Sequence, residues 1–286
     1  MNSQAKYEQR YSFEFFPPKT EVGMEKLKKV QQELAEKNPS FFSVTYGAGG
    51  STRDRTFDTV KSVKEGTGIC TAPHLSCVGD TKEQLAQLLQ QYKENGINRI
   101  VALRGDLPSG MGASLGELKY ASDLVAFIRE QTGDHFHLEV AAYPEMHPQA
   151  QSMNADLQAF KTKVEAGASS AITQYFFNVD AYKFFIDSCE KMGLDLPIMP
   201  GIMPITNYEN LMRFSNTCGA EIPRWIRTRL EAYGDDLESI KQFGEEVVSN
   251  LCQQLLDMGA PGLHFYTLNQ AAPTLGIWNN LGLNQE

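Results

Sequence analysis

Short apolar runs of strand length alternate with longer stretches of helical periodicity along the chain. Runs rich in aromatic and β-branched residues lie at 11–16, 41–45, 69–74 and 100–103, and similar runs follow at 136–142, 170–174, 196–199 and 263–266. That composition is typical of buried strands. The stretches between most of these runs repeat apolar residues every three or four positions, which predicts amphipathic helices. The pattern therefore predicts a βα unit repeated about eight times.

The predicted helices share an apolar stripe and lie at 21–36, 53–65, 82–95, 117–130, 154–165 and 181–192. A glycine follows several of them, as a left-handed residue that closes a helix requires. These glycines are Gly66, Gly96, Gly133, Gly167 and Gly193. One interval between strands is longer and contains three helical stretches, at 208–216, 223–233 and 237–258. We therefore expect extra helices before the last strand.

The order of elements predicts the fold class. Strands about 30 residues apart suit parallel pairs joined by crossover helices. Eight such units favour a single closed (β/α)8 TIM barrel, although a doubly wound sheet has the same order of elements and stays open as an alternative. No Pro/Ser-rich linker divides the 286 residues. We therefore predict one catalytic (β/α)8 barrel domain over residues 1–286, without a regulatory domain.

Charge and composition narrow the class of protein. The formal net charge is −9 and the Lys and Arg residues are scattered, so we expect no nucleic-acid partner. No apolar run approaches the roughly 20 residues of a membrane helix, and residues 1–10 are polar, unlike a signal peptide. These features predict a cytoplasmic protein without a membrane partner. The 5 cysteines include no C-x-x-C pair, which argues against a disulfide framework or a zinc ribbon.

Polar residues close or follow most of the predicted strands. In a (β/α)8 barrel the chemistry takes place at the C-terminal ends of the strands. Any single polar residue there could be a cap or a turn residue, but several that converge on one mouth predict a site. The set consists of Glu14, Thr45, His74, Asp106, Tyr143, His147, Gln174 and Tyr266.

Glu14 is the most unusual member of this set. It stands in a run of phenylalanines directly before the Pro-Pro pair at 17–18, and strand alternation turns it away from its aromatic neighbours. An apolar setting disfavours the ionised form of a carboxyl, as a general acid that works near neutral pH requires. A capping carboxylate or a buried ion pair is the alternative interpretation.

Two further motifs suggest other chemistry. The glycine-rich segment at 47–52 departs from phosphate-loop motifs and is interpreted as a loop near a ligand or as a tight turn. His74, Asp106 and His147 would be the ligands of a metal-dependent barrel hydrolase, our alternative function. This ligand set does not close convincingly. A His-x-His pair at 135–137 also resembles a metal motif, but it opens its strand and so lies at the end of the barrel associated with stability. We predict no metal.

Several sequence blocks, in order, resemble one known family. They include SFEFFPPK at 12–19, FSVTYGAGGSTRDRT at 42–56 and APHLSC at 72–77. IVALRGDLP, AAYPEMHP, AITQYFF, PGIMPITN and HFYTLN follow. From about residue 12 to 268 the chain resembles the bacterial type of methylenetetrahydrofolate reductase, an FAD-dependent barrel enzyme.

The resemblance implies a reaction, cofactors and partners. The family reduces 5,10-methylenetetrahydrofolate to 5-methyltetrahydrofolate, which supplies methyl groups for methionine synthesis. Non-covalent FAD carries the hydride in two separate half-reactions, and NADH is the expected donor ahead of NADPH. A reduced folate and a nicotinamide dinucleotide are thus the expected small-molecule partners, and a homo-oligomer is the expected assembly. A binding module for folate or flavin without turnover is a further reading, and it would not need Glu14.

The resemblance also implies roles for residues at matching positions. Glu14 would be the general acid that protonates the leaving N10 of the folate, and Asp106 would stabilise the resulting cation. The folate would be bound by Gln174, Asn210, Phe214 and Gln270. FAD would be bound by Thr45, Tyr46, Ala48, His74, Arg104, Gly105, Asp106, Tyr120, Tyr143, His147, Asp156 and Lys163. Departures from the family pattern are Ala159 and Thr162 near FAD, and Asn210 and Gln270 at the folate.

Overall fold

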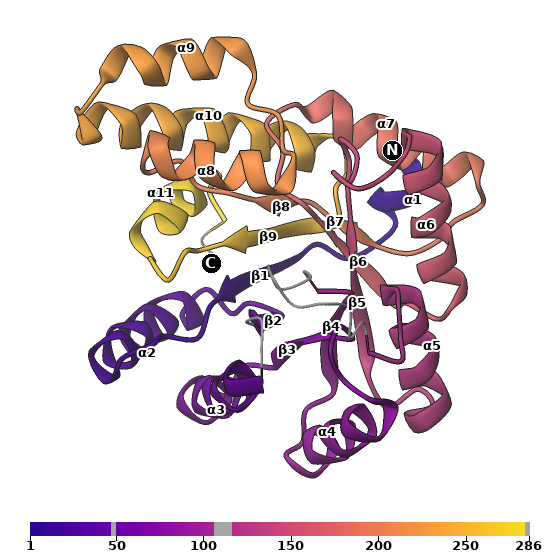
Figure 1. Ribbon diagram of the computed structural model, residues 1–286. Coiled ribbons are helices and arrows are strands. Elements are labelled where there is room, and N and C mark those ends of the chain that lie inside the picture. Colours follow the sequence, from indigo (N-terminus) through magenta and orange to yellow (C-terminus); the bar gives the residue numbers. More distant parts are fainter. Residues whose placement is uncertain (47–49, 106–115, 284–286) are drawn as a thin grey trace. The chain divides into compact units, whose positions relative to one another are not determined.

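A parallel sheet surrounded by helices forms the framework of the protein (Figure 1). The computed structural model describes residues 1–46, 50–105 and 116–283, and for residues 50–53 the backbone only. Within these ranges nine strands form one sheet in the order β7-β6-β5-β4-β3-β2-β1-β9-β8. Strands and helices alternate along the chain, so the predicted α/β fold of TIM-barrel type is confirmed.

The strands match the predicted runs, with two differences. The third strand lies two residues further along the chain than the predicted 69–74. The seventh is split in two at Pro200, which has no N–H to donate to a strand ladder. The strands are β1 (Arg10–Phe15), β2 (Phe41–Val44), β3 (Thr71–Ser76), β4 (Arg99–Leu103), β5 (His137–Ala142), β6 (Ser170–Thr173), β7 (Ile198–Met199), β8 (Gly201–Ile202) and β9 (Gly262–Tyr266).

The helices include the three extra ones predicted before the last strand. The helix expected at 117–130 begins later, and the sequence pattern had not indicated α1 or α11. The helices are α1 (Asn2–Ala5), α2 (Glu21–Ala35), α3 (Gly50–Thr67), α4 (Lys82–Glu94), α5 (Ala121–Thr132), α6 (Met153–Glu165), α7 (Val179–Lys191), α8 (Tyr208–Cys218), α9 (Arg224–Tyr233), α10 (Leu237–Asp257) and α11 (Ala272–Asn280).

Glycine ends four of the helices as predicted, and one assignment was wrong. Gly66 lies inside α3, which continues to Thr67, and Gly68 takes the left-handed conformation with φ of +73°. Helical periodicity alone cannot choose between two glycines two residues apart. The four confirmed positions, all with positive φ, are Gly96, Gly133, Gly167 and Gly193.

The chain divides into two compact units. Unit 1 comprises Met1–Tyr11, Ala142–Gln158 and Ile172–Glu286, and unit 2 comprises Ser12–Ala141 and Ala159–Ala171. The single domain expected from the sequence stays a prediction.

In unit 2 the alternation of strand residues separates an apolar face from a polar one. Phe13 and Phe15 are buried, and both rings pack against Phe42 of β2. Helix α3 packs on β2 and β3 and helix α5 on β4 (Figure 1). Register places Glu14 of β1 opposite Ser43 of β2, so these side chains share the face turned away from the phenylalanines. The predicted orientation of Glu14 is confirmed.

In unit 1 the N-terminal residues are tied to distant parts of the chain. The side-chain amide of Gln4 donates to the carbonyl oxygen of Leu196 and accepts the N–H of Ile198, at 3.2 and 2.9 Å. The ring of Tyr11 meets that of Trp278 in α11 edge-on, with ring centroids 5.0 Å apart. Residues almost 270 positions apart in the sequence therefore pack against each other in this unit.

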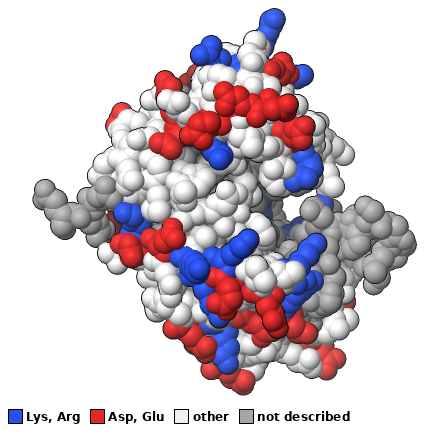
Figure 2. Space-filling model, turned by 90° about the vertical axis from the view of Figure 1, so that its left-hand side faces the viewer, with Lys and Arg blue, Asp and Glu red and all other residues white. Residues whose placement is uncertain are grey.

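The charged surface mixes both signs. On the face shown in Figure 2, Lys and Arg side chains stand beside Asp and Glu side chains. None of the helices in the described part of the chain combines the length and apolar character that a membrane crossing requires.

Candidate active site

Glu14 is the penultimate residue of β1, and its carboxyl group meets polar neighbours. The Ser43 hydroxyl donates to Oε2 at 3.5 Å, and Nε2 of His74 lies 3.2 Å from the same oxygen. The side chain of Glu14 is 16% exposed. The sequence predicted an apolar setting. That expectation needs correction, because alternation turns Glu14 from the phenylalanines towards a polar face of the sheet.

His74 of β3 is the more buried partner. Its side chain is 9% exposed. Although Nε2 stands at hydrogen-bond distance from Glu14, the ring is not aligned for a hydrogen bond there, and among the described residues this buried nitrogen has no other hydrogen-bond partner. The contact is a close approach of an imidazole and a carboxyl at a distance typical of a hydrogen bond, without the alignment of one.

The turn after β4 holds Arg104 and Gly105 close to β3. The Ser76 hydroxyl donates to the carbonyl oxygen of Arg104 at 2.7 Å. Gly105 has φ of +87°, and a Cβ there would lie 1.9 Å from the Ser76 oxygen, so a larger residue would be strained and would displace this hydroxyl. Burial raises the pKa of the neighbouring Cys77 to about 11, which keeps this thiol protonated and unreactive at neutral pH. Asp106, which follows Gly105, lies outside the described residues.

Thr45 and Tyr46 follow β2 and are half-buried. The carbonyl oxygen of Thr45 accepts a hydrogen bond of 3.0 Å from the hydroxyl of Thr56 in α3. This bond fixes the path of the chain as it leaves the strand. Ala48 lies outside the described residues.

Two further residues predicted to bind FAD stand elsewhere in unit 2. Lys163 in α6 donates from Nζ to the carbonyl oxygen of Ala141 at 2.5 Å, which ties the helix to the end of β5. Tyr120 precedes α5 and is 61% exposed. The predicted roles of both residues in binding FAD stay predictions.

In unit 1, three of the predicted residues form a second cluster. Tyr143 follows β5 directly, and its ring meets that of His147 edge-on with centroids 4.6 Å apart. The backbone N–H of His147 donates to Oδ2 of Asp156 at 2.7 Å. Nδ1 of His147 accepts the N–H of Gln149 at 3.0 Å, so the proton of a neutral His147 ring is on Nε2. The cluster therefore offers an aromatic face, an N–H donor and a carboxylate.

The residues predicted to bind folate are spread over unit 1. Gln174 directly follows β6, and its side-chain oxygen accepts the N–H of the next residue at 3.0 Å. Asn210 is an exposed residue of α8, and its oxygen accepts from Arg213 at 3.0 Å. The guanidinium of Arg213 stands 5.1 Å from the ring centre of the half-buried Phe214. Gln270 is exposed just after β9.

Comparison with known proteins decides the family. The family model described as methylenetetrahydrofolate reductase matches residues 1–282. The chain belongs to this family. It is therefore an enzyme, an oxidoreductase, as the blocks from SFEFFPPK to HFYTLN predicted.

Individual relatives agree with this assignment. The chain is 43% identical over 275 residues to the 5,10-methylenetetrahydrofolate reductase of Pectobacterium carotovorum, covering 96% of this chain and 91% of that protein. It is 38% identical to methylenetetrahydrofolate reductase (NADH) 1 of Zea mays, covering 96% of this chain and 49% of that protein. A Clostridium thermocellum structure, described as binding two copies of 5-methyl-5,6,7,8-tetrahydrofolic acid, is similar in fold, with a TM-score of 0.64, 18% identity and coverage of 99% and 97%.

Membership of the reductase family argues against the alternative function, a metal-dependent hydrolase. Within the described residues, His, Cys, Asp and Glu side chains form no group of three that could hold a metal ion. The His-x-His pair at 135–137 has a structural role. Nε2 of His135 lies 3.1 Å from the carbonyl oxygen of Ile97, and His137 opens β5 as predicted.

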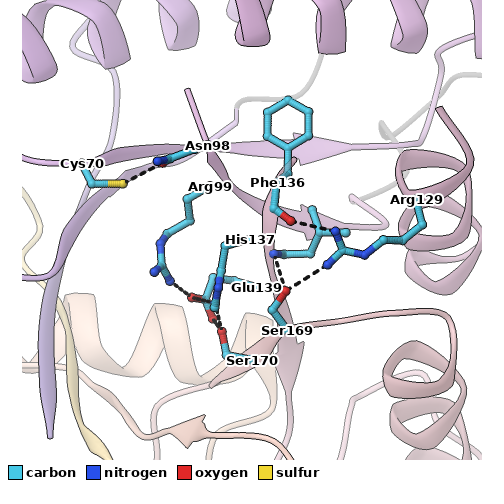
Figure 3. Close-up of polar contacts among 10 residues, drawn as sticks. Cys70, Asn98, Arg99, Arg129, Phe136, His137, Glu139, Ser169 and Ser170 are labelled. Atoms are coloured by element: carbon cyan, nitrogen blue, oxygen red, sulfur yellow. Dashed lines mark hydrogen bonds and ion pairs between the residues drawn. The ribbon is translucent and has the colours of Figure 1, made fainter. Parts of the chain in front are cut away.

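The reductase also contains a buried charged cluster that we did not predict (Figure 3). Glu139 of β5 is fully buried and forms an ion pair with Arg99 of β4. Nε2 of His137 lies 3.3 Å from its Oε1, and the Ser170 hydroxyl donates to its Oε2 at 2.5 Å. Burial alone would raise the pKa of Glu139, but the hydrogen bonds and positive charges around it lower that pKa to about 2. The carboxylate is therefore permanently ionised at neutral pH.

Proposed function

We propose that the enzyme reduces 5,10-methylenetetrahydrofolate to 5-methyltetrahydrofolate with FAD, in two separate half-reactions, and takes its hydride from NADH in preference to NADPH. The observation that carries the proposal is the Glu14 carboxyl at the end of β1, in contact with Ser43 and His74, in a chain that the reductase family model matches over residues 1–282. The name of the maize relative includes NADH, and the described ligand of the Clostridium structure is a reduced folate. Both support these choices.

Glu14 would act on the folate half-reaction. The bond between N10 and the methylene carbon breaks, N10 takes the proton of Glu14, and the carbon stays on N5 as a cationic iminium. The carbon then takes a hydride. The flavin supplies the hydride chemistry when bound. Each turnover thus consumes one hydride from the nicotinamide and one proton, which Glu14 recovers from solvent.

The donor set fits FAD in its chemistry. Arg104 and Lys163 are cations suited to a diphosphate, and the carboxylate of Asp156 suits hydroxyl groups of a ribose or ribityl chain. His147 adds the N–H of its Nε2. Gly105, whose missing Cβ lets the chain turn tightly after β4, allows a ligand to approach the backbone closely. The remaining predicted contacts to FAD are those of Thr45, Tyr46, Ala48, His74, Asp106, Tyr120 and Tyr143.

The residues proposed for the folate have distinct roles. The amide of Gln174 would hydrogen-bond the folate and later the nicotinamide, and the ring of Phe214 would stack on a flat ring. Asn210 and Gln270 would meet the folate, and the carboxylate of Asp106 would stabilise the iminium cation. We further propose that the enzyme is a cytoplasmic homo-oligomer that supplies methyl groups for methionine synthesis.

An absorbance spectrum of the purified protein tests the proposal. We expect a yellow protein whose flavin band is bleached by NADH without oxygen, more slowly by NADPH, and is restored by methylenetetrahydrofolate. A colourless protein that cannot be reconstituted with FAD would contradict the proposal. Bleaching without recovery on adding the folate would contradict the assigned substrate.

A further inference from the structure

We propose that His74 is a positioning residue for the proton donor of the reductase. In this role Nε2 of His74 orients the Glu14 carboxyl and stabilises the carboxylate that remains after the proton has left. The inference rests on the proposed function, because it presupposes that Glu14 is the acid. It adds a role that differs from contact with FAD, the role implied by the family resemblance.

The geometry places two groups on the same oxygen of Glu14. Ser43 and His74 come from the two strands that follow β1 in the sheet, β2 and β3. Both approach Oε2, at 3.5 and 3.2 Å. Three neighbouring strands thus each contribute one side chain to one face, and the side chains from two of them approach the same carboxyl oxygen of the third.

The burial of His74 shows why this contact matters. A buried polar atom that makes no hydrogen bond is unfavourable, because it has given up its contact with water, and Nε2 of His74 is buried without one in the described structure. The Glu14 oxygen stands 3.2 Å away. Nε2 can therefore complete a hydrogen bond through a small rotation of the carboxyl group.

The hydrogen bond would strengthen during the reaction. An N–H donor binds an ionised carboxylate more tightly than a protonated carboxyl. When Glu14 transfers its proton to N10 of the folate it becomes ionised, and an N–H at Nε2 of His74 then stabilises it. His74 keeps its own proton throughout, so the proton balance of the reaction is unchanged. The expected benefit is confined to the folate half-reaction, where Glu14 gives up its proton.

Two substitutions at one position isolate the Nε2 atom. The amide nitrogen of Gln can reach close to the Nε2 position, whereas the shorter side chain of Asn cannot. We expect His74→Asn to slow reoxidation of the flavin by methylenetetrahydrofolate about tenfold, less than the roughly 10²-fold or more that removing the acid itself causes. His74→Gln should recover most of this rate. In enzyme saturated with FAD, the rate of flavin reduction by NADH should agree within about twofold between the Asn and Gln variants, as measured by stopped-flow absorbance, so that only the folate half-reaction separates them.

A control variant and a binding measurement separate this role from others. His137→Asn removes the other imidazole that contacts a glutamate in unit 2, and both half-reactions should be preserved. The affinity of the apoprotein for FAD, measured by flavin fluorescence, should be similar in His74→Asn and His74→Gln. If His74→Asn weakens FAD binding and slows both half-reactions equally, or if Asn and Gln behave alike, His74 does not position Glu14.

A spectroscopic test does not depend on turnover. In apoprotein with 13C-labelled histidine rings, the His74 signal can be assigned by its loss in His74→Gln. Glu14→Gln should shift this signal and leave that of His137 unchanged. An unshifted signal would overturn the inference. Failure of the proposed function looks different, since Glu14→Gln would then leave the folate half-reaction at the rate of the unsubstituted enzyme, whatever His74 does.

Discussion

Two glutamates in unit 2 share the same kinds of neighbours but differ in their burial. Glu14 and Glu139 each have an imidazole nitrogen within 3.3 Å and a serine hydroxyl that donates to the carboxyl group. Glu139 is fully buried and paired with Arg99, whereas the side chain of Glu14 is 16% exposed. A guanidinium fixes a carboxylate in its ionised form. The ion pair with Arg99 therefore keeps Glu139 ionised, and its charge has a structural role.

Position along the strand separates the two residues as well. Glu139 is the third residue of β5, and Glu14 is the fifth of the six residues of β1. Substrates of (β/α)8 enzymes bind at the C-terminal ends of the strands. A charged residue between apolar neighbours is therefore expected to take part in chemistry near the C-terminal end of a strand, and to have a structural role near its start. Substitution of Glu139 should therefore lower the stability of the protein, whereas substitution of Glu14 should slow the folate half-reaction.

The largest effect on stability is expected for Glu139→Gln. Loss of the carboxylate leaves the Arg99 side chain, 14% exposed, without its buried ion-pair partner. Breaking a buried pair costs about 3–5 kcal/mol in the free energy of unfolding, to be measured by urea denaturation. Glu14→Gln serves as the matched control and should cost less than about 1 kcal/mol. If the two substitutions cost equal amounts, the distinction between the two clusters fails.

Acid should weaken the Glu139 cluster as well, with a slightly smaller loss of unfolding free energy than Glu139→Gln causes. The pKa of Glu139 is lowered from 4.5 to about 2, so its stabilising contribution is complete above pH 5 or so and is lost as the pH falls towards 2. The shift corresponds to about 3 kcal/mol. In Glu139→Gln, the slope of unfolding free energy against pH should flatten between roughly pH 5 and pH 2. An unchanged slope would show that other carboxyls carry the acid sensitivity.

The sequence predicted the fold from features that are local along the chain. Periodicity identified the strands, and glycines marked where Gly96 and Gly133 end their helices. Errors arose where a local rule allows two answers, as for Gly66, where α3 continues for one more residue. The split of the seventh strand at Pro200 was readable in principle, because proline cannot donate to a strand ladder.

The contacts within the site were less predictable. Glu14 and His74 were each identified as polar residues at strand ends, but their contact depends on the order and register of β1, β2 and β3. The Glu139 cluster was missed, although the sequence carried a signal. His137 and Glu139 alternate with the buried Leu138 and Val140, which is the pattern that singled out Glu14. A charge within such a strand demands a partner, and the sequence does not show that Arg99 provides it.

Serine substitutions should give smaller effects that sharpen the comparison. Ser170→Ala removes the donor at 2.5 Å from Glu139, and a hydrogen bond to a charged group contributes about 1.5–3 kcal/mol. We expect a loss of unfolding free energy near the lower end of this range, with both half-reactions unchanged. A loss of catalytic rate without a loss of stability would contradict the structural role of this cluster.

The smallest effect is expected for Ser43→Ala. The contact of its hydroxyl with Glu14 is long, at 3.5 Å, and such bonds are weak. The folate half-reaction should slow about two- to threefold, with the NADH half-reaction and the unfolding free energy nearly unchanged. A slowing as large as that caused by His74→Asn would mean that Ser43 holds the carboxyl instead.

The most direct test of the central claim compares the two half-reactions in Glu14→Gln by stopped-flow absorbance. The amide keeps the size of the side chain but cannot act as an acid. We predict that NADH reduces the flavin at a nearly unchanged rate, while reoxidation by methylenetetrahydrofolate slows by roughly 10²- to 10⁴-fold. Preservation of both rates in this variant would show that Glu14 is not the proton donor.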